Sequence, residues 1–182
     1  MWVFIALGAY LLLSAAIFLI LNAGKDRAPV FKMPKSAFLY YLLSFTWGLP
    51  MTFLGCLTAL VLLIAKKRPV RCGRNICFFL PKIGFGLSLG IFIIAPEEYD
   101  AGLLMHEHGH GIQNVYLGPF MPTVVALPSV IRFWARELYE KKTKNKPRKP
   151  YDAAWFEKSA TNSGGKFFKD AGRLPPRPPK RP

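Results

Sequence analysis

The sequence is poor in cysteine, which limits the kinds of scaffold it can build. It has three cysteines, Cys56, Cys72 and Cys77. An odd number cannot all pair, and Cys56 lies inside a long apolar run. The count excludes a scaffold held by several disulfides and a four-cysteine zinc site. We therefore interpret Cys72 and Cys77 as reduced residues near a membrane interface.

Acidic residues are also scarce. Ten Asp and Glu stand against 25 Lys and Arg, which gives a formal net charge of +15. In a soluble protein this charge would suggest nucleic-acid binding. Here the basic residues lie beside apolar runs and in the C-terminal tail, where anionic lipid is the simpler partner. The sequence therefore argues for lipid contact and against a nucleic-acid partner.

Charged residues are absent from two long apolar runs. Residues 2–21 are long enough, at about 1.5 Å per residue, to cross a hydrocarbon core of about 30 Å. Met1 and Trp2 provide no basic n-region, which disfavours a cleaved signal peptide. Residues 38–65 form the second run, in which Gly48 and Pro50 predict a kink. We expect residues 1–65 to form a two-span anchor in the cell membrane.

The orientation of this multi-pass anchor follows from the positive residues beside it. Cytoplasmic loops usually carry the excess of Lys and Arg. The loop between the runs has Lys25, Arg27, Lys32 and Lys35, but the larger cluster follows the second run and consists of Lys66, Lys67, Arg68, Arg71 and Arg74. We expect both termini, and a site in the C-terminal half, on the cytoplasmic side.

The remaining chain predicts a small α+β domain, mainly α with a β-hairpin. Residues 75–80 and 86–95 are short runs rich in Ile, Phe and Leu, separated by a Pro-Lys-Ile-Gly turn, which predict the hairpin. Helices are expected at 101–117, 128–142 and 151–163, the second of them at the membrane surface or covering the first. Residues 66–163 would then form a compact zincin-like domain, and 164–182 a disordered, basic, proline-rich tail.

All three histidines lie within five residues, in the segment His106-Glu107-His108-Gly109-His110. This segment matches the His-Glu-x-x-His pattern. On a helix, His106 and His110 project from one face, so both imidazoles can bind a single Zn²⁺. Glu107 is then placed to take a proton from the activated water and return it to a leaving amine. We expect His108 and Gln113 to support the ligands, face the substrate or serve the structure.

A two-histidine site needs a third protein ligand, and a carboxylate is the expected type. Most acidic residues are set aside by their place in the loop between the runs, the tail, a surface helix or the start of the metal helix: Asp26, Asp170, Glu137, Glu140, Glu97, Glu98 and Asp100. Asp152 and Glu157 remain. Glu157 is preferred because its neighbours are apolar, where a lone carboxylate is costly. Alternatively, it pairs with Lys158 or a linker lysine.

Three stretches of the chain, within about 47–164, carry a family resemblance. They are Gly48-Leu49-Pro50-Met51-Thr52, residues 106–113 with Leu117-Gly118-Pro119, and Trp155-Phe156-Glu157-Lys158-Ser159-Ala160-Thr161. They resemble a family of uncharacterised small bacterial membrane proteins that look like zinc metallopeptidases. The arrangement is also similar to gluzincins, in which a downstream Glu is the third ligand and an acid four residues later orients a ligand histidine. Thr161 stands at that place here and offers a hydroxyl.

Two functions are consistent with these patterns. The first is a membrane-anchored zinc metallopeptidase that hydrolyses a peptide or protein substrate, with His106, His110 and Glu157 as ligands and Glu107 as general base. The second is a non-catalytic membrane protein with a structural metal site and lipid or partner binding, which the small size of the chain favours.

Overall fold

The chain folds into two compact units, described here from a computed structural model that covers residues 1–23 and 28–172. One unit comprises residues 1–29 and 120–158, and the other residues 30–119 and 159–182. The predicted anchor, residues 1–65, is divided between the two units. Most of the tail predicted to be disordered, residues 173–182, lies outside the described residues.

The first unit is built on helix α1 (Trp2–Ala23), which is long and apolar enough to cross a membrane by itself. Most of its side chains are exposed, as expected for a helix that faces lipid. Tyr10 and Ser14 are the polar exceptions, and their hydroxyls lie 3.1 and 3.0 Å from the Thr123 hydroxyl. Thr123 belongs to a π-helical turn, η2 (Pro122–Ala126), so polar groups join α1 to the rest of its unit.

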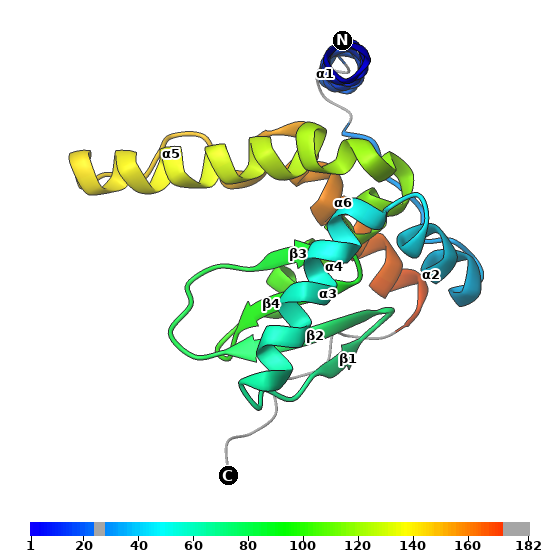
Figure 1. Ribbon diagram of the computed structural model, residues 1–182. Helices are drawn as coiled ribbons and strands as arrows, with labels where there is room; N and C mark the ends of the chain where they lie inside the picture. The colour runs from blue at the N-terminus through cyan, green and yellow to red at the C-terminus, as the bar shows by residue number, and fades with distance from the viewer. Residues whose placement is uncertain (24–27, 173–182) are drawn as a thin grey trace. The chain divides into compact units, whose positions relative to one another are not determined.

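Helix α5 (Leu127–Thr143) forms the long arm of this first unit (Figure 1). The prediction of a helix over 128–142 is confirmed, with a proline in its first turn. No residue of α5 is fully buried. Arg132 and Arg136 donate hydrogen bonds to the carbonyls of Tyr151, Pro150 and Lys149, so the basic linker is held along α5 by its arginines.

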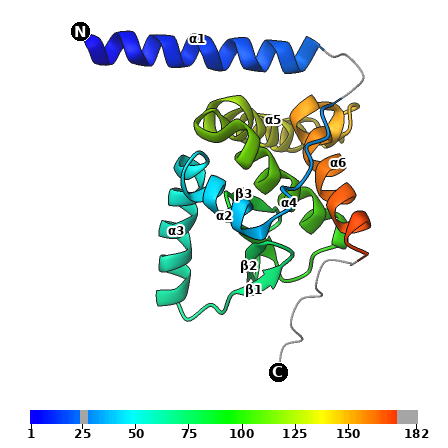
Figure 2. The same ribbon diagram turned by 90° about the vertical axis from the view of Figure 1, so that its right-hand side faces the viewer.

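The second apolar run is broken rather than kinked. It forms α2 (Ala37–Phe45) and α3 (Leu49–Ile64), whose axes differ by 91°. Figure 2 shows this right-angle bend, and many apolar side chains of both helices are exposed. The break falls at Gly48, where a side chain would overlap Asn114. Only when the bent pair is counted as one element are these two helices long and apolar enough to cross a membrane.

A four-stranded sheet lies in the second unit, with strands in the order β1 (Val70–Cys72), β2 (Asn75–Leu80), β4 (Phe92–Pro96), β3 (Leu87–Leu89). The predicted hairpin of residues 75–80 and 86–95 is wrong. Strands β2 and β4 are neighbours, but they pair in parallel. The second run folds back on itself at Gly90, whose φ of +65° makes a turn that only glycine adopts easily. The sheet therefore consists of two short hairpins joined through a parallel pair.

Helix α4 (Ala101–Leu117) is largely buried in the second unit. The helix predicted over residues 101–117 is confirmed with these bounds. The Asp100 carboxylate accepts a hydrogen bond from the Leu103 N–H and caps the first turn, and Gly118 ends the helix with a φ of +54°. Since almost every residue from Glu107 to Leu117 is buried, the histidine segment lies inside the fold and not on a surface helix.

The last helix, α6 (Trp155–Asp170), crosses α4 at glycine residues. A side chain at Gly109 would overlap the Ala160 carbonyl, and one at Gly164 would overlap the Met105 carbonyl. The backbones of the two helices therefore touch. The helix predicted over 151–163 starts at Trp155 and continues to Asp170, so the residues from Gly164 to Asp170 are helical rather than part of a disordered tail.

Gly109→Ala tests the importance of this crossing. Because the added methyl group meets backbone atoms that cannot rotate away, we expect a loss of about 3 kcal/mol of stability, the upper end for overpacking. The measurement is thermal unfolding in detergent. Gly165→Ala is the matched control, since no atom lies within 4 Å of its added carbon, and equal melting temperatures for the two variants would contradict the prediction.

Candidate metal centre

His106 and His110 face each other across one turn of α4. Their Nε2 atoms are 3.1 Å apart, and their rings are perpendicular with centroids separated by 4.7 Å. This arrangement follows from the four-residue spacing, which puts both side chains on one face of a helix. The two ε nitrogens thus point toward a common position.

The outer nitrogen of each ring meets an oxygen. The Nδ1 atom of His106 is 2.9 Å from the Thr161 hydroxyl, and Nδ1 of His110 is 2.8 Å from Oε1 of Gln113. An amide oxygen is an acceptor only, so His110 carries its hydrogen on Nδ1 and leaves a lone pair on Nε2. The Thr161 hydroxyl can donate or accept, so it is compatible with the same tautomer of His106. Such hydrogen bonds are typical of histidines that bind metals through Nε2.

Glu157 brings a carboxylate to the same position. Its side chain is fully buried, and one carboxylate oxygen and one nitrogen from each of His106 and His110 all lie within 4.8 Å of one another. Glu157 and Thr161 are one turn apart on α6, so a single helix supplies both the carboxylate and the hydroxyl that bonds His106. These three residues can hold a metal ion. Among the described residues no other group of three potential ligands meets this criterion.

Glu107 follows His106 on α4 but is not part of this group. The residue is buried, with 5% of its surface exposed. A side chain at Gly86 would overlap its carboxylate, so the segment before β3 passes directly over Glu107. Gly86 leaves the space that the carboxylate fills, a role that the pattern of the sequence did not indicate.

His108 lies on a different side of α4 and has a structural environment. Its ring is fully buried and stacks on Phe167, with centroids 4.4 Å apart. The backbone N–H of Arg74 donates to its Nε2 atom at 3.5 Å. Burial, aided by the positive charge of Arg74, lowers the pKa of His108 to about 3. The neutral ring therefore belongs to the packing of α4 against α6 and the β1–β2 turn.

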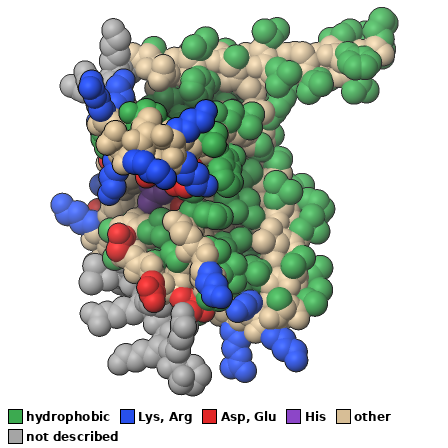
Figure 3. All heavy atoms as spheres, turned by 90° about the vertical axis from the view of Figure 1, so that its left-hand side faces the viewer, with side chains coloured by type: hydrophobic (Ala, Val, Ile, Leu, Met, Phe, Trp, Pro, Cys, Tyr) green, Lys and Arg blue, Asp and Glu red, His purple; other side chains and the backbone are tan. Residues whose placement is uncertain are grey.

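Solvent reaches the group at His106, which is only partly buried, whereas His110 and Glu157 are buried. Figure 3 shows a small patch of histidine atoms at the molecular surface. The remaining sequence candidate for a ligand, Asp152, is exposed and lies in the short helix η3 (Tyr151–Ala153). It does not join the group.

Comparisons with known proteins find no matching family model, no similar curated protein and no similar solved structure. The family resemblance described above therefore stays a prediction. The interpretation of the site rests on its own geometry and on the chemistry of its side chains.

Proposed function

We propose that the protein is a membrane-anchored zinc-dependent hydrolase of metallopeptidase type that cleaves a peptide or protein substrate. The observation that carries the proposal is the convergence of His106, His110 and Glu157; Glu107 follows His106 in the sequence, as the His-Glu-x-x-His pattern requires. Zinc suits this donor set, because two imidazoles and one carboxylate with an open fourth position are common in catalytic zinc sites.

The spacing of the two histidines supports zinc. With nitrogen ligands at about 2.0–2.1 Å and tetrahedral angles, two imidazole nitrogens are about 3.3 Å apart. The two Nε2 atoms are already 3.1 Å apart, so little movement is needed for both to bind one ion. The hydrogen bonds from Nδ1 to Gln113 and Thr161 orient both rings for this role.

The side chains divide the work of hydrolysis as follows. When bound, zinc lowers the pKa of a water molecule toward neutrality and polarises the substrate carbonyl. His106, His110 and Glu157 would hold the ion, and Glu107 would accept a proton from the water that attacks the carbonyl carbon. It then delivers the proton to the amide nitrogen as the C–N bond breaks, so the products are a carboxylic acid and an amine. Glu107 is buried and directly follows the ligand His106 in α4.

Helix α1 need not be the only part of the protein in the membrane. We propose that the bent α2–α3 pair is also embedded, because its exposed side chains are apolar. The positive cluster after α3 favours the cytoplasmic side for the site and contact with anionic lipid. Arg74, which follows α3, donates hydrogen bonds to the carbonyls of Pro34, Lys35 and Ser36, which precede α2. The pair would therefore enter and leave the membrane on one face, so that α1 is the crossing helix and α2–α3 a re-entrant pair rather than the second span of a multi-pass anchor. The metal helix would be zincin-like, as the gluzincin resemblance implies.

A non-catalytic role for the metal is the second candidate, and one observation favours it. Glu157 lies on α6 and the histidines on α4, so an ion held by all three would join the two helices. In that case the ion stabilises the fold, and the open position binds nothing. Zinc without any hydrolysis would support this alternative.

Chelation tests the proposed function directly. Detergent-purified protein is expected to contain about one zinc per chain by elemental mass spectrometry. It should cleave members of a peptide library, lose this activity in 1,10-phenanthroline and regain it when zinc is added. Protein purified without zinc, and unable to bind it, would contradict the proposal.

Thr161→Val probes the support of His106. The substitution keeps the size of the side chain but removes the hydroxyl that meets Nδ1. We expect zinc affinity to fall about tenfold, as is typical when such a hydrogen bond is lost. Competition with a chromogenic chelator measures the change. Asn162→Ala, an exposed neighbour on α6, serves as the control and should leave the affinity unchanged.

A further inference from the structure

The segment from Val30 to Ser36 has no regular secondary structure, yet side chains hold its backbone at several points. The Ser163 hydroxyl accepts a hydrogen bond from the Phe31 N–H at 2.9 Å, and the Tyr116 hydroxyl donates to the Lys32 carbonyl at 2.8 Å. The Arg74 guanidinium donates to the carbonyls of Pro34, Lys35 and Ser36. The segment is therefore fixed against α6 and the β1–β2 turn.

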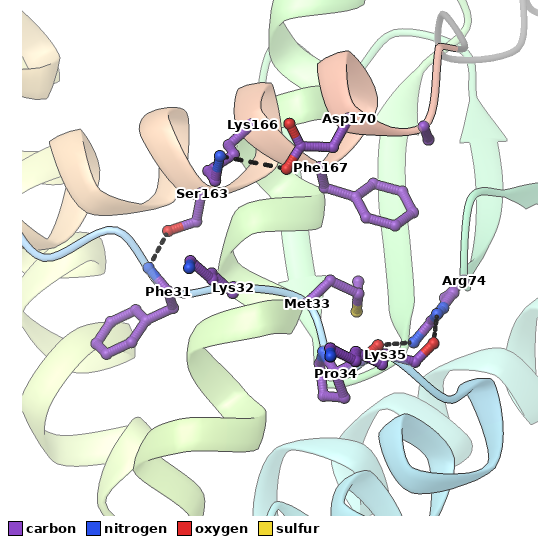
Figure 4. Close-up of a pocket in the computed structure, with 11 residues that line it drawn as sticks. Phe31, Lys32, Met33, Pro34, Lys35, Arg74, Ser163, Lys166, Phe167 and Asp170 are labelled. Atoms are coloured by element: carbon purple, nitrogen blue, oxygen red, sulfur yellow. Dashed lines mark hydrogen bonds and ion pairs between the residues drawn. The ribbon is translucent and has the colours of Figure 1, made fainter.

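This arrangement forms a pocket of about 290 Å³. Figure 4 shows its lining, in which the segment 31–35 runs between α6 and Arg74. Four cationic side chains line it, and they come from three separate parts of the chain: Lys32, Lys35, Arg74 and Lys166. Asp170 is the single carboxylate in the lining. The volume is close to the lower limit of about 300 Å³ for small-molecule sites, which suits a headgroup rather than a whole lipid.

The charges in this pocket are not balanced. Asp170 pairs with Lys166, with their atoms 3.3 Å apart. Neither Lys32 nor Lys35 forms an ion pair within the described part of the chain. The donors of Arg74 already bond backbone carbonyls. An anion in the pocket would offset this excess of positive charge and accept hydrogen bonds from the ammonium groups.

The position of the pocket along the chain indicates where this anion would come from. Helix α2 begins directly after Ser36, and Phe38, Leu39 and Leu42 on it are exposed. Lysines at the end of an apolar membrane helix lie at the level of the lipid headgroups. Phe31, Met33 and Phe167 give the pocket an apolar wall beside its charges, which matches a molecule with a charged head and an apolar body.

We propose that this pocket binds the phosphate of an anionic phospholipid headgroup, with Lys32 and Lys35 as the principal donors and Lys166 assisting. The inference rests on the membrane location proposed above but not on the metal. Ser163 and Lys166 lie on α6, which also carries Glu157. A bound lipid would thus hold the segment before α2 against the helix that supplies the third candidate ligand.

The test titrates full-length protein in non-ionic detergent with dihexanoyl phosphatidylglycerol and counts bound lipid by native mass spectrometry. Lys32→Ala/Lys35→Ala/Lys166→Ala is expected to weaken binding at least about tenfold, since it removes three of the cations that would face the phosphate. The control removes the same charge from exposed helical positions, Lys141→Ala/Lys142→Ala/Lys169→Ala, and should change the affinity less than about threefold. Dihexanoyl phosphatidylcholine should bind more weakly, because its choline cation faces the lysines.

Several outcomes would overturn the proposal. Equal losses in both triple variants would mean a general charge effect, and equal affinity for phosphatidylcholine would mean unspecific lipid contact. Inorganic phosphate that binds as tightly as the lipid would reassign the pocket to a soluble anion. If the first variant does not fold, the single charge reversal Lys35→Glu replaces it with the same expectation. Alkaline extraction of membranes tests the membrane location separately, and zinc content tests the metal site.

Discussion

Glu107→Gln is expected to lower the rate of peptide hydrolysis about a thousandfold while zinc stays bound. A general base of this kind contributes about 10²- to 10⁴-fold to a rate. The amide has the shape of the carboxylate but cannot accept the proton that water loses. The ligand group contains His106, His110 and Glu157 but not Glu107, so zinc binding should persist. The measurements are kcat with a peptide substrate and zinc per chain by elemental mass spectrometry.

The matched control for this experiment is Glu98→Gln, which changes an exposed carboxylate shortly before α4. Its activity should equal that of the wild type. Hydrolysis that survives in Glu107→Gln would refute the role of Glu107 and with it the proposed mechanism. Loss of zinc from the same variant would instead show that Glu107 is a ligand.

Glu157→Gln is expected to abolish tight zinc binding and the stabilisation that zinc provides. The substitution keeps the buried volume and removes one of three candidate ligands. An ion present at a thousand times its Kd stabilises the folded state by about 4 kcal/mol. The wild type should therefore melt at a higher temperature with zinc than without it, and the variant should not respond. Differential scanning fluorimetry in detergent, with and without zinc, measures both.

Asp152→Asn controls for the loss of a negative charge near the start of α6. Asp152 was the other sequence candidate, but it is exposed and outside the ligand group. Its variant should bind zinc like the wild type. If Glu157→Gln binds zinc as tightly as the wild type, the third ligand is a different group and the convergence seen at Glu157 has another cause.

Helix ends could be predicted from the sequence where their signals are local. Asp100 and Gly118 bound α4 as expected, and the proline at its start indicated α5. Strand pairing could not be predicted, because it depends on which segments meet in space. The run 87–94 lacked a clear turn signal, since the only glycine inside it, Gly90, also suits a strand bulge. Its positive φ, together with its close approach to Thr52, is visible only in the structure.

The candidate site was easier to anticipate than the fold around it. The spacing of His106 and His110 determines their geometry once a helix forms. Glu157 was singled out because a carboxylate among apolar residues needs a partner, and it is fully buried. The contributions of Gly86, Gly109 and Gly164 could not be found in this way. The role of each glycine becomes visible only from the atoms that an added side chain would overlap. Those atoms belong to other parts of the chain.

The glycines of α4 affect the order in which the protein folds and binds its metal ion. Gly109 and Gly111 lie in the middle of this helix, and each costs an isolated helix about 1 kcal/mol relative to alanine. Helix α4 therefore gains its stability from partners, and one of them, α6, leaves the ribosome only after α4. Glu157 emerges some fifty residues after His106. A nascent chain would present two histidines on a poorly formed helix, so the choice of ion falls to the finished, folded protein.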